Sequence, residues 1–171
     1  TCMMVIGMDE NRHKRVIHVH HEKNMSFNQQ IDKIIELNAR FNPVIIELET
    51  NNFAMAFNQV LQEISDLPIK PFNMSRMKKE ALMHTLQLHF EQRHLIIPYK
   101  DEGATRRHMN TMLNELSYFT MLENGKMESL GRHDDMVIAL ALSVQATKEY
   151  RENIIILDGE TWQNRLGWAD A

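Results

Sequence analysis

Apolar residues in this chain recur with two spacings, and each spacing predicts a different kind of element. β-rich runs at 1–7 and 15–20 flank a polar turn, which predicts an antiparallel hairpin. A continuous apolar run over 136–144 predicts a helix packed against a sheet. The remaining segments are predicted helices at 26–40, 53–64, 75–92 and 104–119, strands at 44–52, 67–72, 95–98 and 154–157, and a second hairpin at 117–129 turning on Asn124-Gly125. Alternating strands and helices predict an α/β domain.

The most unusual stretch is the start of the 136–144 helix, where His133, Asp134 and Asp135 precede the apolar run. Adjacent carboxylates beside apolar surface are costly unless a positive group lies with them, and a divalent metal ion is one solution. Capping is the other interpretation, because an aspartate side chain accepts backbone N–H groups at a helix start. A cap uses one acid, so both interpretations stay open.

A second candidate acid ends the predicted strand at 44–52, which reads as a buried parallel strand. Glu47 and Glu49 share one face, and Glu49 opens onto the following loop. Because catalytic acids of α/β proteins gather at the carboxyl ends of strands, Glu49 is the better candidate, while an edge strand with two solvated glutamates is the alternative. Asp9 also ends an apolar run, and its polar neighbours favour a hairpin-turn residue.

Histidines and basic residues give weaker signals. His18 and His20 share a strand face with no acid at matching spacing, which favours a solvated or aromatic-like surface over a metal cluster. Helix starts offer free N–H groups to phosphate, and two of the predicted helices begin with cations. These cations are Arg76, Lys78 and Lys79 in one helix, and Arg106 and Arg107 in the other. A solvated charged turn is the alternative.

Composition sets limits on these interpretations. The chain has 171 residues, 43% hydrophobic, enough for one domain with a full core, which we expect over about 1–150 with a C-terminal extension over 151–171. A single cysteine excludes an intramolecular disulfide framework, and no apolar run is long enough to predict a membrane span. The net charge of −4 gives no overall basic surface, so contacts with nucleic acid depend on local patches.

Taken in order, these elements follow a ribonuclease H-like fold, a mixed central sheet flanked by helices, with its first strand absent from residues 1–171. Four motifs resemble the nuclease domain of the large terminase subunit of tailed bacteriophages, and the similarity spans about residues 1–148. They are the run Ile46-Glu47-Leu48-Glu49-Thr50-Asn51, the segment 75–79, Glu115-Leu116 before an aromatic residue, and Gly131-Arg132-His133-Asp134-Asp135 followed by Ala139.

The resemblance implies a DNA endonuclease that cuts concatemeric viral DNA during packaging, with two Mg²⁺ or Mn²⁺ ions acting on the phosphodiester. It implies Glu49, Asp134 and Asp135 as catalytic metal ligands, with His133 beside the metals. A further acid is expected on a strand upstream of Thr1, or else Asp9 takes that role. DNA contacts are expected from Arg76, Lys78, Lys79, Arg106, Arg107 and Arg132.

The same resemblance implies partners and a place of action. We expect double-stranded DNA, a portal protein, a small terminase subunit and a separate ATPase domain, because these residues contain no Gly-x-x-x-x-Gly-Lys phosphate loop. The expected location is the cytoplasm of the infected bacterium, transiently at the procapsid portal. Two alternatives remain: another ribonuclease H-like nuclease of the resolvase or transposase type, or a non-catalytic module that binds DNA or the portal.

Overall fold

The structure, a computed structural model, describes residues 1–50, 59–61, 63, 66–98, 103–121, 127–129 and 133–149. The predictions for 53–58, Asn124-Gly125, Arg132 and 154–157 lie outside these residues. The helices are α1 (Phe27–Phe41), α3 (Arg76–Glu91), α4 (Gly103–Ser117) and α5 (Asp135–Glu149). The strands are β1 (Cys2–Met8), β2 (Lys14–His21), β3 (Ile46–Glu49), β4 (Ile69–Phe72), β5 (Leu95–Ile96), β6 (Phe119–Met121) and β7 (Met127–Ser129).

Strand pairing confirms the mixed α/β class. β1 and β2 form the predicted antiparallel hairpin, and β5 pairs parallel to β2. β3 pairs parallel to β4, as expected for a strand that lies between two helices in the sequence. β6 and β7 form a separate antiparallel pair. No helix within the described ranges has the length and apolar character to cross a membrane.

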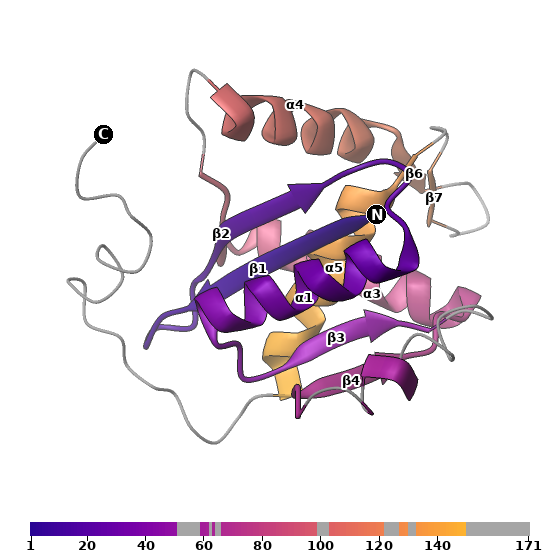
Figure 1. The fold of residues 1–171 in the computed structure, drawn as a ribbon. Helices are drawn as coiled ribbons and strands as arrows, with labels where there is room; N and C mark the ends of the chain where they lie inside the picture. Colours follow the sequence, from indigo (N-terminus) through magenta and orange to yellow (C-terminus); the bar gives the residue numbers. More distant parts are fainter. Residues whose placement is uncertain are drawn as a thin grey trace.

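Helices cover both faces of the strands (Figure 1), with α1 on one side and α5 on the other. Met3 of β1 packs with Ile31 and Ile34 of α1, whereas its neighbours Cys2 and Met4 pack in the cluster built around α5. This division follows from the alternation of side chains along a strand. α5 is the most buried helix, and its fully buried residues include Met136, Val137, Leu140, Ala141 and Val144. Burial of each larger side chain contributes about 1.5–3 kcal/mol.

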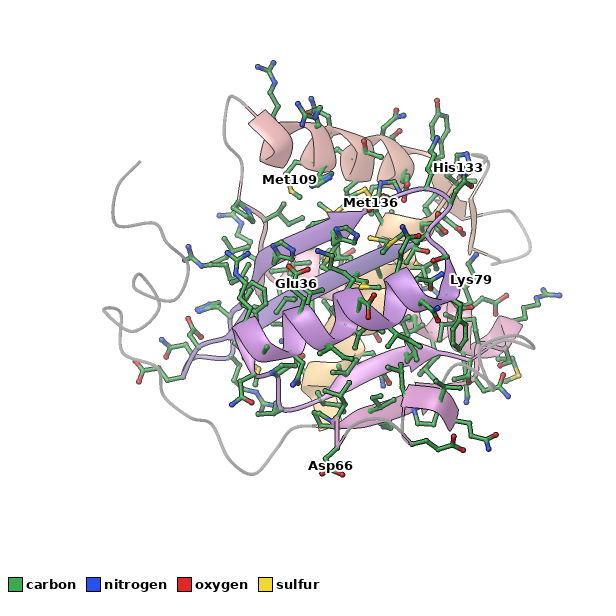
Figure 2. The ribbon with its side chains drawn as sticks, viewed as in Figure 1. Glu36, Asp66, Lys79, Met109, His133 and Met136 are labelled. Carbon is green, nitrogen blue, oxygen red and sulfur yellow. The ribbon has the colours of Figure 1, made fainter. Side chains whose placement is uncertain are left out.

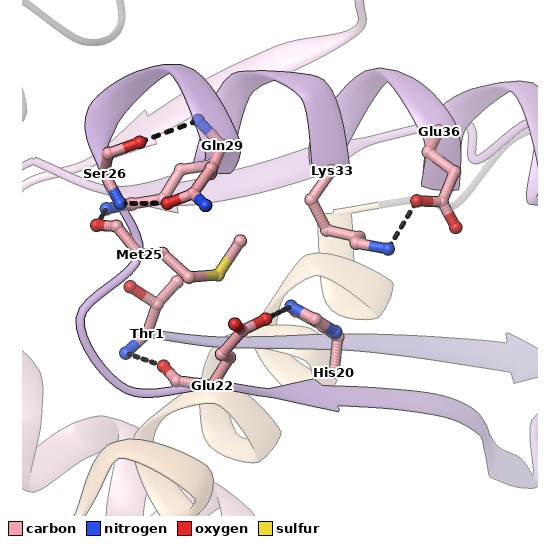
Figure 3. Close-up of polar contacts among 9 residues, drawn as sticks. Thr1, His20, Glu22, Met25, Ser26, Gln29, Lys33 and Glu36 are labelled. Atoms are coloured by element: carbon pink, nitrogen blue, oxygen red, sulfur yellow. Dashed lines mark hydrogen bonds and ion pairs between the residues drawn. The ribbon is translucent and has the colours of Figure 1, made fainter.

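The first helix shows how local sequence sets the boundaries. Ser26 and Gln29 form a capping box at the start of α1, in which each side chain holds the other's backbone N–H (Figure 3). Asn42 ends the helix in the left-handed region at φ 44°, a conformation that asparagine tolerates, and Pro43 follows. The predicted helix over 26–40 is therefore confirmed.

His18 and His20 of β2 lie partly covered. The ring of His18 lies 5.3 Å from that of Phe41, and His20 lies beside Glu22, 3.5 Å away (Figure 3 shows the latter pair). Burial is the main cause that lowers the pKa of both imidazoles. The predicted solvated or aromatic-like surface fits His18, which contacts an aromatic ring, and His20 is 19% exposed.

A slot separates β1 from β3. It has a volume of about 820 Å³ and is lined by the whole of β1 on one side, residues 43–49 on the other, and parts of α1 and α5. In the described residues β1 pairs only with β2, and β3 only with β4. β1 begins at the N-terminus and runs opposite to β3 (Figure 1). The space thus lies between two strand edges, where the expected ribonuclease H-like sheet has one more strand.

β4 carries a proline in its ladder. Its residues pair in register with those of β3, with Pro71 opposite Leu48. The carbonyls of Pro68 and Phe72 accept hydrogen bonds from Ile46 and Thr50, both at 2.8 Å, so the backbone of Pro71 points away from β3. The N–H of Ile69 is bonded to the carbonyl of Leu67 at 2.7 Å. Because Pro71 faces away from β3, its missing N–H removes no hydrogen bond between β3 and β4.

The corner between α3, β5 and the first hairpin gathers three histidines. The ring of His94 lies 5.6 Å from that of His13 and 6.3 Å from that of His89. Asp9 caps the hairpin turn by accepting the N–H of His13 at 2.8 Å, so its prediction as a turn residue is confirmed. Both ring nitrogens of His89 are buried with no hydrogen-bond partner in the described part of the chain. Burial, and then the charge of Lys14, lower the pKa of His89 to about 4.

We predict that a strand supplied from before Thr1 fills the slot. A protein extended by roughly 25 upstream residues, enough for one strand and its turn, should have a higher melting temperature than residues 1–171. Amides of β1 and β3 that face the slot should exchange more slowly in the longer protein. Equal melting temperatures and equal exchange would show that the two strand edges need no further partner.

Because the imidazole of His89 is buried, we predict that the stability of the fold decreases in acid. The pKa of His89 is about 4 when folded, against 6.5 as the ordinary value, so the unfolded chain takes up its proton first as the pH falls. The contribution of His89 to stability is present above pH 6.5 and is lost progressively toward pH 4. Urea unfolding of His89→Phe should show a smaller loss between these two pH values. His84→Phe, an exposed histidine of the same helix, is the control and should behave like the parent.

Candidate active site

The amino end of α5 is held by a carboxylate from another helix. Glu115, only 5% exposed in the last turn of α4, accepts the backbone N–H groups of Met136 at 2.9 Å and Val137 at 3.2 Å. The main-chain carbonyl of Asp134 accepts the N–H of Ile138 at 2.9 Å, which begins the helical ladder. The expected capping by an aspartate side chain is therefore wrong for these two N–H groups.

Three of the predicted acids line the same slot. Glu49 lies at the carboxyl end of β3, and Asp134 and Asp135 lie at the amino end of α5. Asp135 is exposed, and no hydrogen bond or ion pair involving its carboxylate occurs within the described ranges. The fold thus brings together acids that lie about 85 residues apart in the sequence.

Lys79 supplies a positive charge to these acids. Its Nζ donates a hydrogen bond to Oδ2 of Asp134 at 2.6 Å, and both side chains are about one-third exposed, at 34% and 31%. The same ammonium lies 5.9 Å from the centre of the Phe119 ring. The expected DNA contact of Lys79 stays a prediction, and in the structure its ammonium contacts Asp134.

The acids change the electrostatics of their neighbours. Burial, followed by the charges of Glu115 and Asp135, raises the pKa of the Cys2 thiol to about 12. Burial also raises the pKa of Glu47, and the charge of Lys70 in the opposite register position partly opposes this. Oε2 of Glu47 is buried without a hydrogen-bond partner among the described residues, and its side chain lines the slot. A second strand acid therefore belongs to the same space as Glu49.

The other predicted residues that the structure describes do not line the slot. His133 is exposed and does not line the slot, although it is on the same side of the molecule as Lys79 (Figure 2). Arg76 pairs with Glu80 at 3.2 Å. Arg106 and Arg107 are exposed at the opposite end of α4 from Glu115, about 13 Å along the helix axis. Asp9 lies in the hairpin turn and does not line the slot.

Carboxylate oxygens are the donors that Mg²⁺ and Mn²⁺ prefer, so the chemistry of Glu49, Asp134 and Asp135 fits a hard divalent ion. Their placement is incomplete, because no group of three or more His, Cys, Asp or Glu side chains within the described ranges is positioned to hold a metal ion. The ammonium of Lys79 lies where a cation would meet Asp134. Glu49, Asp134 and Asp135 thus supply some of the ligands that a metal site would need.

Sequence reasoning gave no structural role to Glu115, although a signal for it was present. Met109 and Met112 are fully buried, and Glu115 continues their spacing of three residues, which places it on the buried face of α4. A carboxylate on a buried helix face needs a partner, and a helix amino end is a suitable one.

Comparison with known families shows which family the domain belongs to. The profile described as "Terminase RNaseH-like domain" matches residues 1–146. This chain belongs to that family. The crystal structure of the large terminase nuclease from thermophilic phage G20c with bound cobalt has a TM-score of 0.63 and 20% sequence identity, with 84% of this chain and 81% of that chain covered. A second crystal structure of the large terminase nuclease from thermophilic phage G20c has a TM-score of 0.60 and 19% sequence identity. The match covers 84% of this chain and 82% of that chain. No curated protein matches.

Family and fold together confirm the resemblance drawn from the sequence. The terminase match covers the described elements from β1 through most of α5. The similarity to the two G20c structures, at about one-fifth identity, supports the ribonuclease H-like fold. Within this terminase domain Glu49, Asp134, Asp135 and Lys79 line the slot, and the Glu115 contact holds the backbone that follows Asp134 and Asp135.

We predict that Glu115 maintains the amino end of α5. Glu115→Ala leaves two buried N–H groups without an acceptor, and the free energy of unfolding should fall by about 2–4 kcal/mol. Glu115→Gln retains one neutral acceptor and should lose about half as much. Glu91→Ala, at an exposed glutamate of α3, is the control. Chemical unfolding of the three variants measures the difference, and equal stability of Glu115→Ala and Glu91→Ala would contradict the role.

Proposed function

We propose that this chain is the nuclease domain of a large terminase subunit and hydrolyses phosphodiester bonds of viral DNA with divalent metal ions. The observation that carries the proposal is that Glu49, Asp134 and Asp135 line the same slot in a terminase-family domain. The cobalt in one G20c structure supports the use of a divalent ion. Family membership favours this function over a resolvase or transposase type.

In the proposed reaction Glu49, Asp134 and Asp135 hold two Mg²⁺ or Mn²⁺ ions. When bound, such ions activate a water molecule and stabilise the leaving oxygen. The protein's own contribution is positional. The hydrogen bonds that Glu115 accepts from α5 fix the backbone next to Asp134 and Asp135, and the pairing of β3 with β4 fixes Glu49. Fixed ligands lower the cost of assembling the reactive geometry.

Concatemeric DNA is the proposed substrate, and the basic residues of two helices are its proposed contacts. Lys78 is exposed at the start of α3, and Arg106 and Arg107 are exposed near the start of α4. Such residues bind phosphates without reading sequence, so affinity should fall steeply with salt. An ATPase domain, a portal protein and a small terminase subunit are the proposed partners, and residues 1–171 are proposed to form one nuclease domain that acts at the portal of infected cells.

Removing an acid should separate activity from stability. Asp135→Ala should abolish Mn²⁺-dependent nicking of plasmid DNA and leave the melting temperature in metal-free buffer equal or higher, because one repelling carboxylate is lost. Glu49→Ala should abolish nicking as well. The control is Asp32→Ala, at an exposed aspartate of α1 that does not line the slot. A variant of Asp135 or Glu49 that nicks normally would remove that residue from the proposed site.

A further inference from the structure

The first turn of α3 carries three cations whose side chains have different partners. Arg76 is paired with Glu80 on its own helix, at 3.2 Å. Lys78 lies over the ring of Phe72, with Nζ 5.3 Å from the ring centre. Lys79 points to the acids and contacts Asp134. Neighbouring lysines of equal charge therefore lie in different surroundings, and only Lys79 shares the slot with Glu49, Asp134 and Asp135.

The Lys79 ammonium and a metal ion need the same oxygen atoms. Oδ2 of Asp134 already accepts a charge-assisted hydrogen bond from Lys79, and a carboxylate in such a bond is a weaker ligand for a second cation. The pair is about one-third exposed, so the attraction is moderate and a divalent ion can displace the ammonium. Lysine has a flexible four-carbon stem, which lets Nζ move without movement of the helix.

We propose that Lys79 couples metal binding to DNA binding. Without metal, its ammonium neutralises Asp134 and reduces repulsion among the acids. When metal occupies Asp134, the ammonium is released and binds a phosphate oxygen of the DNA held at the same acids. This inference rests on the proposed nuclease function and adds to it a positioning residue that acts in two states.

The coupling is reciprocal. If Mn²⁺ frees Lys79 for phosphate, then DNA that holds Lys79 must also leave Asp134 more available to Mn²⁺, by the same factor. Mn²⁺ and DNA should therefore each strengthen binding of the other. The effect should be larger than the one that attraction between the metal charge and the phosphates produces alone. Asp134 also stays neutralised when no metal is bound, which reduces the repulsion of incoming DNA by the acids.

The experiment compares Lys79→Met with Lys78→Met in the intact protein. Each variant removes one charge from the same helical turn, but only Lys79 contacts Asp134. Calorimetric titration with Mn²⁺ in the absence of DNA should show binding about three- to tenfold tighter for Lys79→Met than for the parent, because no ammonium has to be displaced. Lys78→Met should remain close to the parent.

The second measurement is fluorescence anisotropy of a phosphorothioate-protected duplex, with and without Mn²⁺. The gain in DNA affinity caused by Mn²⁺ should be smaller in Lys79→Met than in Lys78→Met, and Lys79→Arg should restore most of it. If Lys79→Met bound Mn²⁺ more weakly and had a lower melting temperature, the ion pair would be merely structural and the proposal would be overturned. Equal behaviour of the two Met variants would overturn it as well. A parent protein that neither binds Mn²⁺ nor nicks DNA would overturn the nuclease function as well.

Discussion

The hydrogen bonds that the amino end of α5 donates to the carboxylate of Glu115 are the constraint on which the rest of this domain depends. They join α4 to the most buried helix and satisfy two N–H groups that water cannot reach. They also leave the side chains of Asp134 and Asp135 available for other partners. A helix capped by its own aspartate would have used one of these carboxylates. Structural and chemical roles are thus divided between different acids.

This division explains how several carboxylates coexist near one helix end. Glu115 interacts with backbone dipoles, Asp134 with an ammonium, and Asp135 remains exposed. Each acid has a different source of stabilisation, so their repulsion is distributed rather than concentrated. Burial is the main cause of the high pKa of the Cys2 thiol at the start of β1, and the charges of Glu115 and Asp135 raise this pKa further.

Most of the fold could be predicted from the sequence because its signals are local. The Ser26 cap, the Asn42-Pro43 stop and the turn at Asp9 each act within a few residues. The parallel strand ending at Glu49 followed from its place between helices. The Lys79–Asp134 pair and the Glu115 contact could not be predicted in the same way, because they join residues 55 and 21 positions apart. Such contacts depend on how helices pack.

The outer edge of β4 determines whether another strand can pair with this sheet there. Of the backbone groups that point away from β3, the N–H of Ile69 is already bonded to Leu67, and Pro71 has none. An incoming strand would find carbonyls there but no free donor between 69 and 71, so it could not form a ladder. Another copy of the protein is therefore discouraged from adding to this edge. The outer edge of β4 thus protects the domain from open-ended addition of further strands at this side.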